Sequence, residues 1–187
     1  MRILAVSGSL RASSSNTALL QAAVALAPRG IDLSFYAGLG DIPHFNPDLD
    51  DERVSRAVTD WRAQLQSSDG VVFSTPEYAH GIPGVLKNAL DWVVGSGELA
   101  EKPVTLFNAS PRGTYAQDAL TETLTVMSAK VVLASALTLQ LLGRSLSASQ
   151  VAADPAMSAA LRAGIDSFAL AISHHIMGNP ARNVGVS

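Results

Sequence analysis

The sequence predicts an α/β fold, a doubly wound five-stranded parallel sheet with helices on both faces. Apolar runs of strand length alternate with stretches of helical periodicity along the chain. The runs are apolar at nearly every position, which is typical of parallel strands that are covered on both sides. The 187 residues suit one domain, and a composition of 48% hydrophobic and 16% charged residues can build its core. We therefore expect residues 1–187 to form a single domain.

The predicted strands are short aliphatic runs set between glycine, proline, serine or charged residues. They are expected at Arg2–Val6, Ile31–Tyr36, Gly70–Ser74, Pro103–Ala109 and Lys130–Ser135. In an open sheet of this kind, ligands bind beyond the carboxyl ends of the strands. The site is therefore expected in the loops after the first, third and fourth strands. These loops are Ser7–Ser15, Ser74–Gly84 and Ala109–Thr114.

The predicted helices follow the strands and repeat apolar residues at helical spacing. They are expected from about Ser15 to Ala27, from Val54 to Leu65, at Pro83–Val94, at Tyr115–Ser128 and from Met157 to Ile176. The third of these ends in the apolar stretch Trp92-Val93-Val94, which could lie in the core or at an interface between copies.

Composition excludes several kinds of chemistry. The chain has no cysteine, so disulfides, thiolate nucleophiles and iron–sulfur clusters are ruled out, and redox chemistry would need a bound cofactor. Its net charge is −3, and its 13 basic residues form no run, which disfavours nucleic-acid and membrane partners. The start "MRILAVSG" is too short for a signal peptide, and no apolar run approaches the ~20 residues of a membrane span. A cytoplasmic location is expected.

The stretch "SGSLRASSSNTALL" joins the first strand to the first helix. Free backbone N–H groups and the positive end of the helix dipole meet at such a helix start, which suits an anion. Serine hydroxyls can add donors, and Arg11 can offer a planar fork to phosphate oxygens. Neither the P-loop pattern nor G-x-G-x-x-G is present, so a phosphomonoester fits better than a triphosphate or dinucleotide. Taken alone, the loop is explained equally well by helix capping.

The stretch "STPEYAHGIPGVLKNALDW" follows the third strand. Prolines stiffen it, and Gly81 and Gly84 allow the backbone to approach a flat ligand closely. Tyr78 can pack beside an aromatic ring. The alternative is a plain connector, with Glu77 as a solvated carboxylate. Lys87 and Asp91 are spaced for a surface ion pair.

Together, "GSLRASSSN" and "PEYAHGIPGVLKNALDW" resemble the NADPH-dependent FMN reductase family, and the resemblance runs from Ile3 to about Ser135. That family has flavodoxin-like folds and includes quinone, azo-dye and chromate reductases. The resemblance implies FMN as cofactor, NADPH or NADH as co-substrate, a small-molecule electron acceptor, and a homodimer or homotetramer.

The resemblance also implies which residues form the site. The FMN phosphate would be held by Ser9, Arg11, Ser14, Ser15, Asn16 and Thr17. The isoalloxazine would be bordered by Pro76, Glu77 and Tyr78 on one edge and by Ser110, Pro111, Arg112 and Gly113 on the other. The sequence departs from the family's frequent PEYNGSIPG at Ala79 and His80, and from its glycine-richer later loop at Thr114 and Tyr115. These departures affect substrate and nicotinamide preference. His80 could contact substrate or face water.

No catalytic side chain and no metal site are expected. G-x-S-x-G is missing, and hydride transfer through a flavin needs no nucleophile. Acidic residues at 48, 50 and 51 are interpreted as stabilising a helix start. The adjacent His174 and His175 lack the i, i+4 spacing of a helical metal pair.

The predicted function is therefore an FMN-dependent NAD(P)H oxidoreductase with a ping-pong mechanism. Its acceptor would be a flavin, a quinone, an azo compound or a metal oxyanion. The alternative is a flavodoxin-type electron carrier without a nicotinamide site of its own. The modest net charge speaks against that alternative, because such carriers usually need a strongly charged face. A third possibility is a flavin-free phosphate-ester binder or hydrolase.

Overall fold

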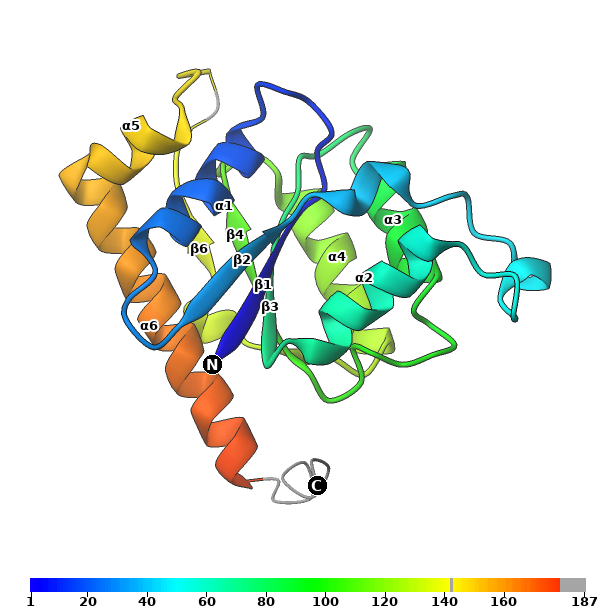
Figure 1. Ribbon diagram of the computed structural model, residues 1–187. Helices are drawn as coiled ribbons and strands as arrows, with labels where there is room; N and C mark the ends of the chain where they lie inside the picture. Colours follow the sequence, from blue (N-terminus) through cyan, green and yellow to red (C-terminus); the bar gives the residue numbers. More distant parts are fainter. Residues whose placement is uncertain (142, 179–187) are drawn as a thin grey trace.

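A parallel sheet forms the centre of the molecule and carries helices on both faces, as the computed structural model shows for residues 1–141 and 143–178 (Figure 1). The strands are β1 (Arg2–Ser7), β2 (Asp32–Tyr36), β3 (Gly70–Ser74), β4 (Pro103–Asn108), β5 (Lys130–Val131) and β6 (Leu137–Thr138). The helices are α1 (Ser15–Leu26), α2 (Arg56–Ser67), α3 (Gly84–Asp91), α4 (Thr114–Val126), α5 (Ala148–Ala153) and α6 (Pro155–Gly178). The strand order is β2-β1-β3-β4-β5, with every pair parallel. This order is the flavodoxin-like one, so the predicted fold class is confirmed.

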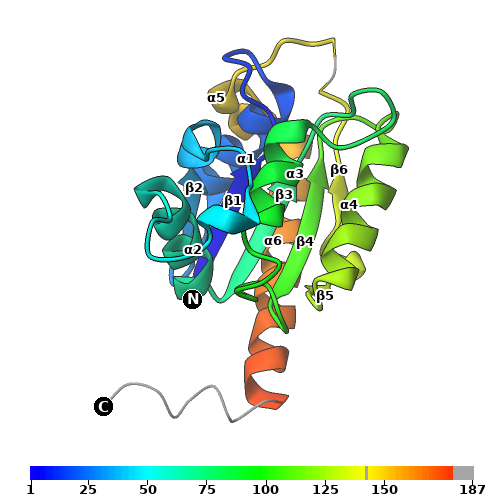
Figure 2. The same cartoon turned by 90° about the vertical axis from the view of Figure 1, so that its right-hand side faces the viewer.

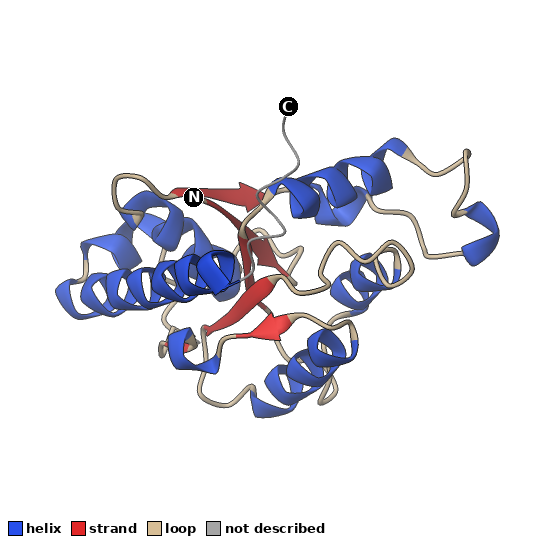
Figure 3. Cartoon of the chain, turned by 90° about the horizontal axis from the view of Figure 1, so that it is seen from below, coloured by secondary structure: helices blue, strands red, loops and turns tan. Residues whose placement is uncertain are grey.

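The two faces of the sheet carry separate apolar cores. Along β1, Leu4 and Val6 face the layer of α2, α3 and α4, whereas Ile3 and Ala5 face the layer of α1, α5 and α6. Figures 2 and 3 show these helices on opposite sides of the strands. Because helices cover both faces, successive residues of a strand are buried on one face or the other. This explains why the strand sequences are continuously apolar.

The fifth strand position is occupied by two short segments rather than by the predicted strand Lys130–Ser135. β5 pairs with the start of β4 and β6 with its end, and a 3₁₀ turn at Leu133–Ser135 separates them. The cause is a polar residue in the middle of β4. The buried hydroxyl of Thr105 donates to the carbonyl of Val132 (3.2 Å), and the Ser135 hydroxyl donates to Thr105 Oγ1 (3.0 Å). These side-chain hydrogen bonds take the place of the backbone hydrogen bonds that would continue the pairing with β4.

The long helix α6 packs directly on the backbone of the sheet. A Cβ atom placed on Gly70 at the start of β3 would lie 2.6 Å from Cδ1 of Ile172, so a larger residue there would require the side chains of α6 to shift. The apolar face predicted for this helix is buried as expected. The short helix α5 was not predicted. It begins with a capping box in which Ser147 and Gln150 satisfy each other's backbone N–H groups.

The connection from β2 to α2 extends from the body of the molecule (Figure 1). Asn88 on α3 holds its base, because Oδ1 accepts the N–H of Phe45 (2.7 Å) and Nδ2 donates to the carbonyl of Pro43 (2.9 Å). Trp92 donates to the same carbonyl over 2.8 Å. Trp92 and Val93 are buried in the core, and Val94 is exposed.

The acidic residues of this connection do not cap α2, which corrects the prediction. Ser55 caps the helix, and the first turn contains no acidic residue. Instead, Asp50 pairs with Arg62 (2.9 Å) and Asp51 with Arg53 (2.7 Å). Hydrogen bonds from Arg53 hold the pKa of the Asp51 carboxyl below its usual range.

Candidate active site

A cavity of about 300 Å³ lies at the carboxyl ends of β1, β3 and β4. It is lined by the three loops that the sequence singled out. Every predicted site residue lines it except Thr17 and Pro111. Four further residues line it that were not among the predicted ones: Ser13, Thr75, Asn108 and Ala109.

The floor of the cavity is fixed by hydrogen bonds between strand ends and α1. The N–H of Gly8 donates to the carbonyl of Ser74 (2.8 Å), and the Ser74 hydroxyl donates to Oδ1 of buried Asn16 (2.9 Å). A Cβ on Gly8 would lie 2.5 Å from Oγ1 of Thr75. The backbone of the first loop thus contacts a side chain of the second loop at this point. Thr17 belongs to this framework, because its hydroxyl bonds the Ser7 hydroxyl (2.9 Å) rather than facing the cavity.

The start of α1 forms one wall of the cavity. The Ser14 hydroxyl accepts the N–H of Thr17 (3.2 Å), and the Ser14 carbonyl accepts the N–H of Ala18 (2.9 Å). The first N–H groups of a helix have no partner within the helix. Within the described part of the chain, the N–H groups of Ser15 and Asn16 have no partner, so they remain available to a ligand. Beside them, the exposed guanidinium of Arg11 has no hydrogen-bond or ion-pair partner within residues 1–141 and 143–178.

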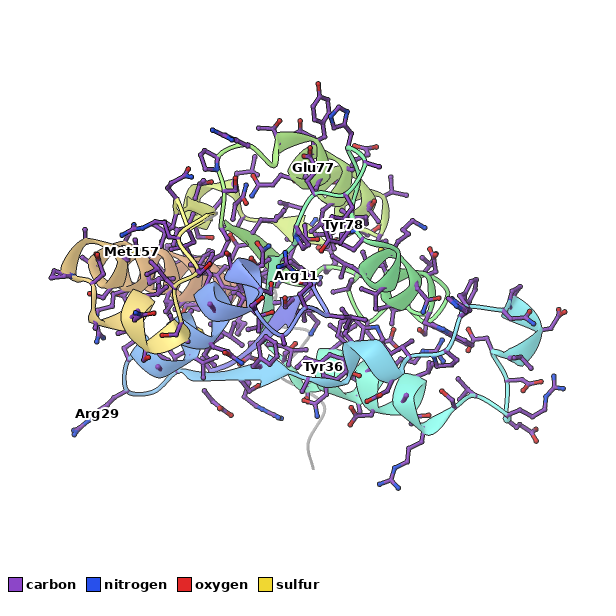
Figure 4. All side chains as sticks on the ribbon, turned by 90° about the horizontal axis from the view of Figure 1, so that it is seen from above. Arg11, Arg29, Tyr36, Glu77, Tyr78 and Met157 are labelled. Atoms are coloured by element: carbon purple, nitrogen blue, oxygen red, sulfur yellow. The ribbon has the colours of Figure 1, made fainter. Side chains whose placement is uncertain are left out.

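The opposite wall is formed by the segment after β3. Oε2 of Glu77 accepts the N–H of Ala116 in the first turn of α4 over 3.0 Å. The N-cap residue of α4, Gly113, supplies no side-chain cap, so the Glu77 carboxylate takes that place. Glu77 is thus a link between two walls rather than a solvated carboxylate. In the view of Figure 4, Tyr78 lies between Glu77 and Arg11, and all three residues line the cavity.

The third wall is the loop after β4, which folds on its own hydrogen bonds. Oδ1 of Asn108 accepts the N–H of Ser110 (3.0 Å), and the Ser110 hydroxyl accepts the N–H of Arg112 (3.1 Å). Arg112 lines the cavity, whereas Pro111 is exposed and does not line it. Asn108 and Ala109 could have been found by the rule that strand ends face the ligand, because Asn108 is the last residue of β4 and Ala109 follows it.

A tight hairpin follows Tyr78. Tyr78 and Gly81 exchange two backbone hydrogen bonds of 3.0 Å each, around the turn residues Ala79 and His80. The φ angles of these two residues are 50° and 58°. The ring of His80 stacks on that of Tyr115, with centroids 4.2 Å apart and planes 14° from parallel. His80 does not line the cavity itself.

The described residues contain no group of three or more histidine, aspartate, glutamate or cysteine side chains that could hold a metal ion. None of their helices has both the length and the apolarity needed to cross a membrane.

Comparison with known proteins gives concordant matches. Residues 1–141 match the model of the NADPH-dependent FMN reductase family. An NAD(P)H-dependent FMN reductase of Pseudomonas aeruginosa, PA1204, is 38% identical over 112 residues, which cover 59% of this chain and 60% of that protein. A quinone reductase of Escherichia coli K12 is 34% identical over 113 residues, again 59% of this chain and 60% of that protein. The chain thus matches less than two thirds of the length of these relatives.

Among solved structures, the flavoenzyme NAD(P)H:(acceptor) oxidoreductase FerB of Paracoccus denitrificans superposes with a TM-score of 0.82 at 27% identity. That superposition covers 93% of this chain and 98% of FerB. A flavodoxin from an archaeon, at 14% identity and a TM-score of 0.62, shares the fold. Because the family model spans residues 1–141 of the 187, this chain belongs to the NADPH-dependent FMN reductase family.

Proposed function

We propose that the chain binds FMN non-covalently in this cavity and transfers electrons from NADPH or NADH to a small-molecule acceptor. The observation that carries the proposal is the meeting of an anion cradle and two walls suited to a flat ring in one cavity. Such a cavity falls within the size range of ligand pockets, about 300–1,000 Å³.

The donor set fits a phosphomonoester. Two free N–H groups at the start of α1, the hydroxyls of Ser9 and Ser14, and the guanidinium of Arg11 surround one end of the cavity. The Ser14 oxygen already accepts a backbone bond, and its hydroxyl proton is free to donate. Charge-assisted bonds of this kind are the strong ones in phosphate recognition.

The rest of the cavity fits a planar ring. Pro76 and Tyr78 would border it on one side, and Ser110, Arg112 and Gly113 on the other. When bound, FMN would supply the two-electron redox chemistry that links nicotinamide to acceptor. The cysteine-free chain supplies position and electrostatics, and no side chain is required as acid, base or nucleophile.

We further propose that nicotinamide and acceptor use the same mouth in turn, which is a ping-pong mechanism. The binding loops lie at a single rim of the sheet, so the second ligand would enter where the first has left. The names of the relatives support FMN or quinone as acceptor, and azo compounds or metal oxyanions are the other candidates. Arg11 and Arg112 give the mouth two cationic groups, which favours anionic ligands.

Absorption spectroscopy tests the proposal. Protein loaded with FMN should lose its visible flavin absorption during anaerobic titration with NADPH or NADH, and recover it when a quinone is added. Reciprocal plots of rate against nicotinamide concentration, at several acceptor concentrations, should be parallel. Intersecting lines would point to a ternary complex. FMN binding without oxidation of either nicotinamide would instead identify an electron carrier.

We also propose a cytoplasmic homodimer or homotetramer built from a single domain over residues 1–187. Light scattering after size-exclusion chromatography measures the molar mass directly, and a monomer would contradict this part.

A further inference from the structure

The turn at Ala79 and His80 is strained. A two-residue hairpin turn with positive φ at both positions normally takes Asn-Gly, because those residues tolerate this backbone. Here an alanine with a φ of 50° and a histidine with a φ of 58° adopt it instead. Left-handed backbone is unfavourable for residues with a Cβ, and such strain persists only where surrounding contacts maintain it. The turn therefore needs a contact that holds it.

Beyond the two backbone hydrogen bonds between Tyr78 and Gly81, the turn has one further contact of this kind, the stack of His80 on Tyr115. The rings lie 4.2 Å apart and nearly parallel, and Tyr115 belongs to the first turn of α4. Its neighbour Ala116 donates to Glu77. Two adjacent residues of α4 thus hold the hairpin from both sides, one through the carboxylate before Tyr78 and one through the ring after it.

Tyr78 lies between these two links. Tyr78 lines the cavity and is 50% exposed, so part of its surface is available to a second ligand. We propose that His80 and Tyr115 form a positioning pair, which holds Tyr78 at the cavity mouth for the planar ring of the nicotinamide or the acceptor. This inference rests on the function proposed above, and it makes the pair a determinant of KM for these ligands rather than of FMN affinity.

A role in global stability alone does not account for the pair. Tyr115 is 56% exposed and His80 is exposed, so the stack buries little area. Glycine at position 80 would keep the turn and remove its strain at that residue. What histidine adds over glycine is the ring.

Four variants and one matched control separate the ring from the turn. His80→Gly keeps the turn and removes the ring, whereas His80→Phe keeps a ring. Tyr115→Ala and Tyr115→Phe repeat the comparison from the other side. The control Ala79→Gly relieves strain at the neighbouring turn residue and leaves the stack intact. All are purified with FMN, and thermal unfolding verifies that each is folded.

Stacked ring pairs contribute enough to expect roughly a 2- to 10-fold effect. His80→Gly and Tyr115→Ala should raise KM for NADPH and for a quinone by that factor, with kcat and the FMN dissociation constant unchanged. The two phenylalanine variants and Ala79→Gly should stay close to the parent protein. A second readout needs no turnover: hydrogen exchange at the amides of Tyr78 and Gly81 should be faster in the two variants that lack the stack.

Unchanged KM and exchange rates in His80→Gly would overturn the proposal. So would an equal increase in Ala79→Gly, since the turn and not the ring would then be responsible. If the parent protein binds FMN but oxidises no nicotinamide, the proposed function fails and the role for Tyr78 fails with it. In that case the exchange rates still report separately whether the stack holds the hairpin.

Discussion

The carboxylate of Glu77 accepts the backbone N–H of Ala116 over 3.0 Å, although Glu77 follows β3 and Ala116 lies in the first turn of α4. This bond joins the walls contributed by two separate loops. It also places a negative charge at the positive end of the α4 dipole. The cavity therefore keeps its shape through a contact between its own walls.

Replacing Glu77 should lower the free energy of unfolding, because the start of α4 loses its cap. A helix cap contributes about 0.5–2 kcal/mol, so Glu77→Ala is expected to cost that amount in urea or guanidinium unfolding. Glu77→Gln keeps an acceptor oxygen and should cost less. Glu122→Ala is the matched control, since Glu122 is an exposed carboxylate on the same helix. An equal loss in Glu77→Ala and Glu122→Ala would contradict the capping role.

Replacing Arg11 should weaken FMN binding through the phosphate. A hydrogen bond to a charged group contributes on the order of 1.5–3 kcal/mol, so Arg11→Ala should raise the FMN dissociation constant roughly 10- to 100-fold. Fluorescence titration measures that constant.

Two controls make the Arg11 result specific. Riboflavin lacks the phosphate, so it should bind the parent and Arg11→Ala alike. Arg29→Ala removes an exposed arginine far from the cavity, as Figure 4 shows, and should leave FMN affinity unchanged. If Arg11→Ala binds FMN as tightly as the parent protein, the phosphate lies elsewhere.

Replacing Tyr78 should affect the second ligand more than the cofactor. Loss of a ring contact corresponds to roughly a 2- to 10-fold change, which we expect in KM for the acceptor in Tyr78→Ala. Tyr78→Phe keeps the ring and should behave like the parent. Steady-state kinetics with a quinone measures the effect, and unchanged kinetics with every acceptor would make Tyr78 a structural residue only.

The free energy of unfolding should fall at high pH because of Tyr36. Burial, followed by the charges of Asp60 and Asp41, raises the pKa of the Tyr36 phenol to about 12. In the unfolded chain the phenol of Tyr36 ionises near pH 10, whereas in the folded protein it is still neutral at that pH. The stability that this group contributes is therefore complete below pH 10 and is lost between pH 10 and about 12, on the order of 2–3 kcal/mol.

Tyr36→Phe tests this assignment. The variant keeps a ring against Trp61, whose centroid lies 4.9 Å from that of Tyr36. It has no phenol to ionise, so its free energy of unfolding should decline less over this pH range. Parallel declines in the two proteins would assign the pH dependence to other groups.

The fold was largely predictable from sequence because burial on both faces of a parallel sheet leaves a clear apolar pattern. Helices α1 to α4 and the long α6 were predicted from the helical spacing of their apolar residues. The edge strand did not, since the interruption comes from Thr105 on the neighbouring strand, and pairing partners are not visible in a local pattern. The short α5 was missed because six residues are too few for a helical period to be recognised.

The loops that form the site were predictable from sequence, whereas the contacts between individual residues of these loops were not. Thr17 has the chemistry of a phosphate ligand, but the sequence does not reveal that the Ser7 hydroxyl already engages it. The link from Glu77 to α4 and the stack of His80 on Tyr115 join residues of different loops. Such contacts depend on the relative placement of two loops, which neither loop's sequence determines.

The divided edge formed by β5 and β6 also bears on how the molecule meets its own copies. A long exposed strand presents a continuous row of unpaired N–H and C=O groups, which can template aggregation by strand addition. Here β5 and β6 each contribute only two residues to the edge, and a 3₁₀ turn separates them. An incoming strand would find no straight partner at this edge. Self-association by strand addition at this edge is therefore disfavoured.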